Sequence, residues 1–139
     1  VCEVQQNSNA TYRLYDYGRR DRYGELRELH IEKALDVIQK SKTIVKPSIT
    51  EGEILTEGYT AKLLGECKYF SCTKYQVKTF VRIAGDKSSF YSVMVLSGTG
   101  QLQVENTIQT FRQGESFFLP AGKKDVQVTG YCEILLTQV

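Results

Sequence analysis

The chain has 139 residues, 41% of them hydrophobic and 24% charged, so it is large enough to bury one ordinary core. Lys and Arg total 18 against 16 Asp and Glu, and a formal charge of +2 is too balanced for a nucleic-acid-binding surface. No apolar run approaches the ~20 residues of a membrane-spanning helix, and no signal-peptide pattern opens the chain. We therefore expect a cytoplasmic protein without a nucleic-acid or membrane partner.

The first predicted element is a strand at the start of the chain with one polar face. Successive side chains of a strand face opposite ways, so Glu3, Gln5 and Asn7 would lie together. Buried polar side chains need partners, and the usual reason to bury them is a site inside a barrel or cleft. A second, aromatic strand is predicted from Tyr12 to Tyr17, followed by a loop from Gly18 to Gly24.

An amphipathic helix is predicted from about residue 28 to residue 40. Its apolar residues recur at the spacing i, i+3, i+4 and i+7, with polar residues between them. We expect this stripe to pack on a sheet. The stripe consists of Ile31, Ala34, Leu35 and Ile38.

Beyond Pro47 the helical period disappears, and short β-branched and aromatic runs recur between turn residues. Strands are predicted at about 52–56, 60–66, 68–77, 90–97, 100–105, 107–112, 115–119, 124–129 and 131–137. This pattern is mostly β and is typical of a jelly roll or β-sandwich, here with one amphipathic helix.

The segment from Tyr91 to Val139 resembles the second half of a cupin barrel. Gly98 and Gly100 are candidate hairpin glycines, and Gly114-x5-Pro120-x-Gly122 matches the second cupin motif. A metal-binding cupin has a histidine at the position of Asp125, and 85–89 offers no His-x-His, so we expect a metal-free barrel. Side chains would then fill its lumen: Phe90, Met94, Leu96, Phe117 and Leu119.

Four cysteines are present, and none forms a C-x-x-C pair. Their apolar and aromatic neighbours favour small buried hydrophobic residues in a reducing compartment. A disulfide between Cys67 and Cys72 is the alternative, if 68–71 forms a hairpin turn. The other two cysteines are Cys2 and Cys132.

The stretch EVQQNSNATYRLYDY, followed by RELHIEKALD, resembles type I mannose-6-phosphate isomerases, which are zinc-dependent cupin enzymes. The resemblance implies that zinc is held by Gln, His, Glu and His residues N-terminal to Val1, so none of these ligands lies in this chain. A zinc site needs three or more converging donors, and His30 is the one histidine present. Capping or surface hydrogen bonding is the favoured interpretation of His30.

The resemblance also implies three site residues. Arg13 aligns with the active-site arginine of the family, and a guanidinium suits a phosphate or enediolate oxygen; a structural ion pair with Glu3 or Asp16 is the alternative. Asn9 stands where the family has an aspartate, and an amide cannot titrate. Glu3 and Asn9 are predicted to bind substrate, although Glu3 fits a solvent-exposed strand residue equally well.

From the resemblance, residues 1–45 would complete a catalytic cupin barrel and add a linking helix, and residues 46–139 would form a metal-free cupin-like jelly roll. The chain would be the C-terminal portion of a mannose-6-phosphate isomerase, inactive by itself. Its partners would be a sugar phosphate and either the missing N-terminal catalytic segment or a homodimer mate, since unpaired strand edges favour pairing. The alternatives are a free-standing, metal-free, sugar-phosphate-binding module and a purely structural domain.

Overall fold

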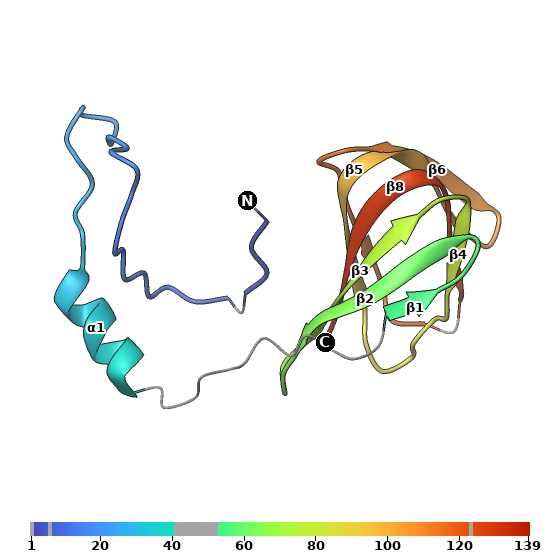
Figure 1. The fold of residues 1–139 in the computed structure, drawn as a ribbon, viewed down its shortest axis with the longest axis horizontal. Coiled ribbons are helices and arrows are strands. Elements are labelled where there is room, and N and C mark those ends of the chain that lie inside the picture. The colour runs from blue at the N-terminus through green and yellow to red at the C-terminus, as the bar shows by residue number, and fades with distance from the viewer. Residues whose placement is uncertain (1, 6, 41–52, 123) are drawn as a thin grey trace. The chain divides into compact units, whose positions relative to one another are not determined.

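The structure is a computed structural model that describes residues 2–5, 7–40, 53–122 and 124–139 (Figure 1). Contacts divide the chain into two compact units, Val1–Val45 and Lys46–Val139, which we call the N-terminal unit and the barrel unit. The described part of the first contains the helix α1 (Ile31–Lys40), and the described part of the second contains the strands. No described helix is both long and apolar enough to span a membrane.

The described residues of the N-terminal unit do not form the two strands predicted for it. Before α1, the described residues form turns and irregular extended chain, with a single bridge between Arg20 and Leu26. A strand requires a neighbour to pair its backbone groups, and the described residues 2–5 and 12–17 pair with no other strand. The prediction of strands there is therefore wrong for these residues.

The helix α1 begins at Ile31, three residues later than predicted. The backbone N–H of Ala34 donates to the carbonyl of His30 at 2.9 Å, which starts the helical bonding. Ala34 is buried, but Ile31, Leu35 and Ile38 are each about half exposed. The expected packing of the whole stripe on a sheet is therefore wrong.

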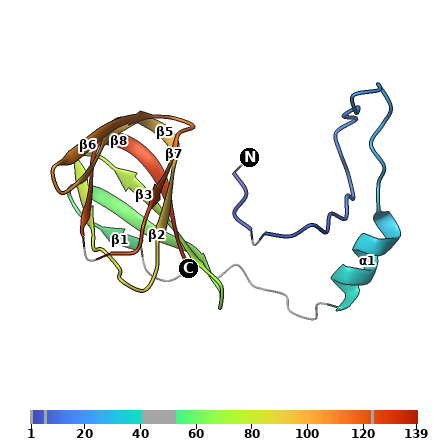
Figure 2. The same cartoon turned by 180° about the vertical axis from the view of Figure 1, so that it is seen from behind.

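The barrel unit confirms the mostly β, cupin-type prediction. Its described strands form one eight-stranded antiparallel sheet that curves round a common interior, and Figure 2 shows β7 beside β5 from behind. The order is β1-β2-β3-β8-β5-β6, with β4 paired to β8 and β7 to β5. The strands are β1 (Glu53–Leu55), β2 (Tyr59–Glu66), β3 (Ser71–Val77), β4 (Phe80–Ile83), β5 (Tyr91–Val104), β6 (Thr107–Arg112), β7 (Ser116–Leu119) and β8 (Val126–Gln138).

The two long strands, β5 and β8, pair with each other along their whole length. Each strand contributes one half to each of the two layers of the barrel unit. The first half of β5 pairs with β7 and its second half with β6, while β8 likewise passes from β4 to β3. Each long strand was predicted as two shorter ones: Gly98 and Gly100 were interpreted as hairpin glycines, and a break was placed at Gly130. They lie instead where the strands approach closely: a Cβ on Gly130 would be 2.5 Å from the carbonyl oxygen of Thr99.

The core lies between the two layers. Val93 and Ile134 of one layer and Val81 and Val128 of the other are almost fully buried in one hydrophobic cluster. In the first half of β5 the predicted lumen residues were one position out of register, which moves every side chain to the other face. The buried residues there are Tyr91, Val93 and Val95, whereas Phe90, Met94 and Leu96 are partly exposed; Phe117 and Leu119 do pack against the core.

The cysteines follow the prediction only in part. Cys72 and Cys132 are buried, but Cys2 and Cys67 are exposed. A turn does connect β2 to β3, with the N–H of Cys67 donating to the carbonyl of Phe70. In this hairpin Cys72 lies opposite Gly65, which leaves Cys67 in the turn, and no disulfide joins the two thiols.

Candidate functional site

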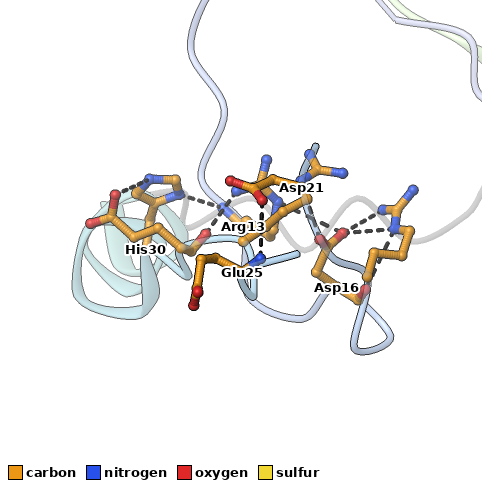
Figure 3. Close-up of polar contacts among 8 residues, drawn as sticks. Arg13, Asp16, Asp21, Glu25 and His30 are labelled. Carbon is orange, nitrogen blue, oxygen red and sulfur yellow. Dashed lines mark hydrogen bonds and ion pairs between the residues drawn. The ribbon is translucent and has the colours of Figure 1, made fainter. Parts of the chain in front are cut away.

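Arg13 is held from several directions in the N-terminal unit (Figure 3). Its Nη1 donates to the carbonyl of Glu28 at 2.7 Å, and its Nε lies 3.8 Å from Oδ1 of Asp16. Its backbone N–H donates to Nδ1 of His30 at 3.2 Å, and its carbonyl accepts from the N–H of His30 at 2.7 Å. The side chain is 17% exposed, so the guanidinium is fixed in place but still reachable from solvent.

Three arginines lie next to the carboxylate of Asp16. Besides Arg13, Arg19 donates from Nε to Oδ1 at 2.9 Å, and Nε of Arg27 lies 3.3 Å from Oδ2. Asp16 is 5% exposed, whereas Arg19 is 63% exposed. One buried carboxylate therefore neutralises only part of a guanidinium cluster, and the remaining positive charge suits an anionic ligand.

A tight loop brings Arg27 back to Asp16. Oδ1 of Asp21 accepts the backbone N–H groups of Tyr23 and Glu25 at 2.8 and 3.0 Å, an arrangement typical of aspartate in turns (Figure 3). The N–H of Arg27 then donates to the carbonyl of Arg19 at 3.4 Å. The sequence predicted a loop from Gly18 to Gly24, but it did not indicate that Arg19 in this loop and Arg27 after it share the buried Asp16.

Glu3 and Asn9 are both exposed in irregular chain. Gln5 and Asn7, the other members of the predicted polar face, are exposed as well. Among the described residues, the groups that contact Arg13 are Asp16, Glu28 and His30 rather than these side chains. The structure thus does not bring the three predicted site residues together, and the assigned roles of Glu3 and Asn9 stay predictions.

The described residues do not fit a zinc ion. They contain no group of three His, Cys, Asp or Glu side chains that could hold a metal. Nδ1 of His30 accepts from Arg13, which assigns the proton of a neutral ring to Nε2, and that nitrogen faces the carboxylate of Glu28 at 3.8 Å. The ring thus has a structural partner on each side.

The family model described as "Mannose-6-phosphate isomerase, cupin domain" matches residues 60–139. The chain belongs to this family. Over its whole length it is 33% identical to the mannose-6-phosphate isomerase ManA of Bacillus subtilis, and over 136 residues it is 33% identical to the mannose-6-phosphate isomerase of Streptococcus mutans. It spans only 43% and 42% of these two relatives.

Solved structures agree with this membership of the mannose-6-phosphate isomerase family. The crystal structure of the mannose 6-phosphate isomerase from Bacillus subtilis matches 96% of this chain with a TM-score of 0.74 at 34% identity, and the match covers 42% of that protein. Streptomyces Pac13, solved with uridine, matches 70% of this chain and 82% of its own with a TM-score of 0.61. At 17% identity, that second likeness shows the cupin fold alone.

Proposed function

We propose that this chain is the C-terminal portion of a mannose-6-phosphate isomerase and that Arg13 acts on the sugar phosphate. In the reaction, C2 of mannose 6-phosphate loses a proton and O1 gains one to give an enediol; O2 then loses its proton and C1 gains one, giving fructose 6-phosphate. A guanidinium stabilises the negative oxygen that develops on this path. Arg13 suits this role because Nη2 takes part in neither its bond to Glu28 nor its approach to Asp16.

The observation that carries the proposal is the match of the entire chain to isomerases more than twice its length. The exposed surface of the N-terminal unit supports it: apolar side chains such as Leu14, Leu35 and Ile38 are about half exposed. Exposed large apolar side chains recur along the described stretch from Tyr12 to Ile38, and apolar surface of this extent is typical of a face that another part of a folded protein covers. In this proposal residues 1–45 complete the catalytic barrel, and residues 46–139 are the metal-free one.

The zinc that the resemblance implies would be bound by residues outside this chain, and Glu3 and Asn9 would meet the substrate in the complete site. The partner of the N-terminal unit would be that preceding segment or a homodimer mate. The natural setting would be carbohydrate metabolism in the cytoplasm, as for other enzymes that interconvert sugar phosphates.

Two measurements test the proposal. The native protein should have an intact mass well above the 15.8 kDa of this chain, and the isolated chain should not turn over mannose 6-phosphate when zinc is added. Turnover by the isolated chain would contradict the proposal that the chain is inactive by itself. A native mass near 15.8 kDa with metal-independent binding of mannose 6-phosphate would support the free-standing binding module instead.

In the complete enzyme, Arg13→Lys should lower kcat by about 100-fold, because an ammonium cannot replace the paired donors of a guanidinium. Arg22→Lys is the matched control, since the guanidinium of Arg22 lies over the ring of Tyr23 at an exposed position and not on Asp16. Equal kcat values for the two variants would contradict the assigned role of Arg13.

A further inference from the structure

The barrel unit contains a cavity of about 450 Å³ that the proposed isomerase function does not use. It is lined by both halves of β5, by the ends of β7 and β8 that face them, and by the loop that carries Pro120 and Gly122. Its apolar wall consists of Tyr91, Val104, Leu119 and Val126. This volume falls in the lower part of the range of about 300–1,000 Å³ that is usual for small-molecule sites.

Tyr91 makes this wall rigid. The residue is 8% exposed, and its hydroxyl donates to the carbonyl of Ala84 at 2.8 Å. Burial, and then the charge of Asp86, raise the pKa of the Tyr91 hydroxyl, so the ring is a neutral surface at physiological pH. The part of this residue that lines the cavity is therefore fixed in place, and with Val104, Leu119 and Val126 it offers an apolar wall to the C–H groups of a ligand.

Negatively and positively charged side chains both line the same cavity. Asp86 supplies a carboxylate that is itself held by Ser88 and Gln138. Glu105 and Lys124 form an ion pair at 2.6 Å, and both are more than half exposed. An exposed pair of this kind contributes little to stability, about 0–1 kcal/mol, so its members can turn towards a ligand.

The mixture of groups selects the class of ligand. Hydroxyl groups both donate and accept, which matches carboxylates beside an ammonium, whereas a protonated amine could only donate. The described charges in the lining are Asp86, Glu105 and Lys124, a sum of −1, which disfavours a phosphate. The described residues also offer no cluster of metal ligands.

We propose that this cavity binds a neutral, hydroxyl-rich molecule of about hexose size, such as an unphosphorylated sugar, without a metal. The apolar wall would take the C–H face of the sugar, while Asp86 and Lys124 would bond to its hydroxyls. The site is distinct from the Arg13 cluster and stands whether or not the chain is part of an isomerase.

A titration of the 139-residue chain with D-mannose and, separately, mannose 6-phosphate tests this proposal by amide NMR shifts. D-mannose should give saturable shifts at Asp86, Thr107 and Ala121, and mannose 6-phosphate should bind at these positions about tenfold more weakly. Shifts that mannose 6-phosphate causes near Arg13 report on the proposed function instead. The absence of shifts in the cavity with D-mannose, or tighter binding there of mannose 6-phosphate, would overturn the inference.

Two variants separate binding from folding. Ala121→Phe places a bulky ring at an exposed position of the cavity lining, so it should abolish the shifts caused by D-mannose while leaving the barrel folded. Glu57→Gln removes a carboxylate at an exposed position that does not line the cavity, and should leave the affinity for D-mannose unchanged. Undiminished D-mannose binding to a folded Ala121→Phe variant would contradict a site in this cavity.

Discussion

Asp16 is the one charged side chain that is buried among the described residues. Three guanidiniums surround it, yet its Oδ2 has no hydrogen-bond partner of good geometry among them. A buried carboxylate keeps its charge only if cations stay close. Asp16 therefore fixes the position of Arg13 and acts on the proposed chemistry through that arginine, as a positioning residue.

Asp16→Asn should loosen the N-terminal unit, because the amide keeps the shape of the side chain but carries no charge to attract the three guanidiniums. Exchange of the His30 amide hydrogen, which bonds to the carbonyl of Arg13, should accelerate about tenfold, equivalent to about 1.4 kcal/mol. Asp36→Asn, at an exposed position of α1, is the control. Equal exchange rates in the two variants would show that Asp16 does not hold the cluster together.

Thiol reactivity should follow burial. Burial raises the pKa of Cys132, and the thiolate is the reactive form, so Cys132 should resist alkylation in the folded protein. Cys67 lies exposed in the β2–β3 turn and should react before Cys132. Peptide mapping after brief iodoacetamide treatment measures both, and faster labelling of Cys132 would contradict the register of β8.

Asp86 should make the barrel unit sensitive to acid. The hydroxyl and N–H of Ser88 donate to its carboxylate and lower its pKa below the ordinary value of 3.8. The resulting stability is present above the unfolded pKa and is lost as the pH falls through the lower, folded pKa. Between about pH 5 and pH 3, the Tm should therefore fall further for the unmodified chain than for Asp86→Asn. Parallel Tm curves would contradict this contribution.

Sequence reasoning singled out Arg13 because its motif is contiguous, and its catalytic role stays a prediction. The alternative of an ion pair with Glu3 or Asp16 named one partner that the structure does place beside it, Asp16. Sequence reasoning missed Arg27, which reaches Asp16 only through the turn that Asp21 holds. That turn depends on side-chain bonds to the backbone, which no periodic pattern reports.

Among the elements, β6 was predicted with its observed bounds, because Thr107–Arg112 has turn residues on both sides. The short strand β4 was missed, although burial alternates along it, since four residues give little periodicity. In β5 the apolar run is continuous, so sequence alone could not determine which face is buried; pairing with β8 decides it.

Gly130→Ala should destabilise the barrel unit by about 1–3 kcal/mol. The residue has a φ of 133°, and a Cβ would meet the backbone of Thr99 and Gly100 in the paired strand. Gly65→Ala is the matched control in β2, since nothing lies within 4 Å of its added Cβ. Urea unfolding gives both values, and equal stability of the two variants would contradict the close approach of β5 and β8.

At the scale of the molecule, the two units differ in how much of their own apolar surface they bury. The barrel unit has one connected core, whereas Ala34 is the buried hydrophobic residue of the described N-terminal unit. The position of a cavity could not be predicted from sequence, because it depends on how far a sheet curves rather than on any local pattern.

A polypeptide of residues 46–139 should therefore fold on its own, with dispersed amide signals and a cooperative thermal transition, because every member of its core cluster lies within it. A polypeptide of residues 1–45 should lack such a transition. The reverse result, or loss of cooperativity in the barrel polypeptide, would mean that the core depends on the N-terminal unit.

Because β5 and β8 each run through both layers, neither layer has a boundary at which it can detach from the other. Local opening of one layer would have to break ladder bonds along strands that also hold the second, so sub-global unfolding is suppressed and the amides of Val93 and Val128 should exchange through one common opening. The exchange rates of these two distant amides should then change together when a ligand binds between the layers.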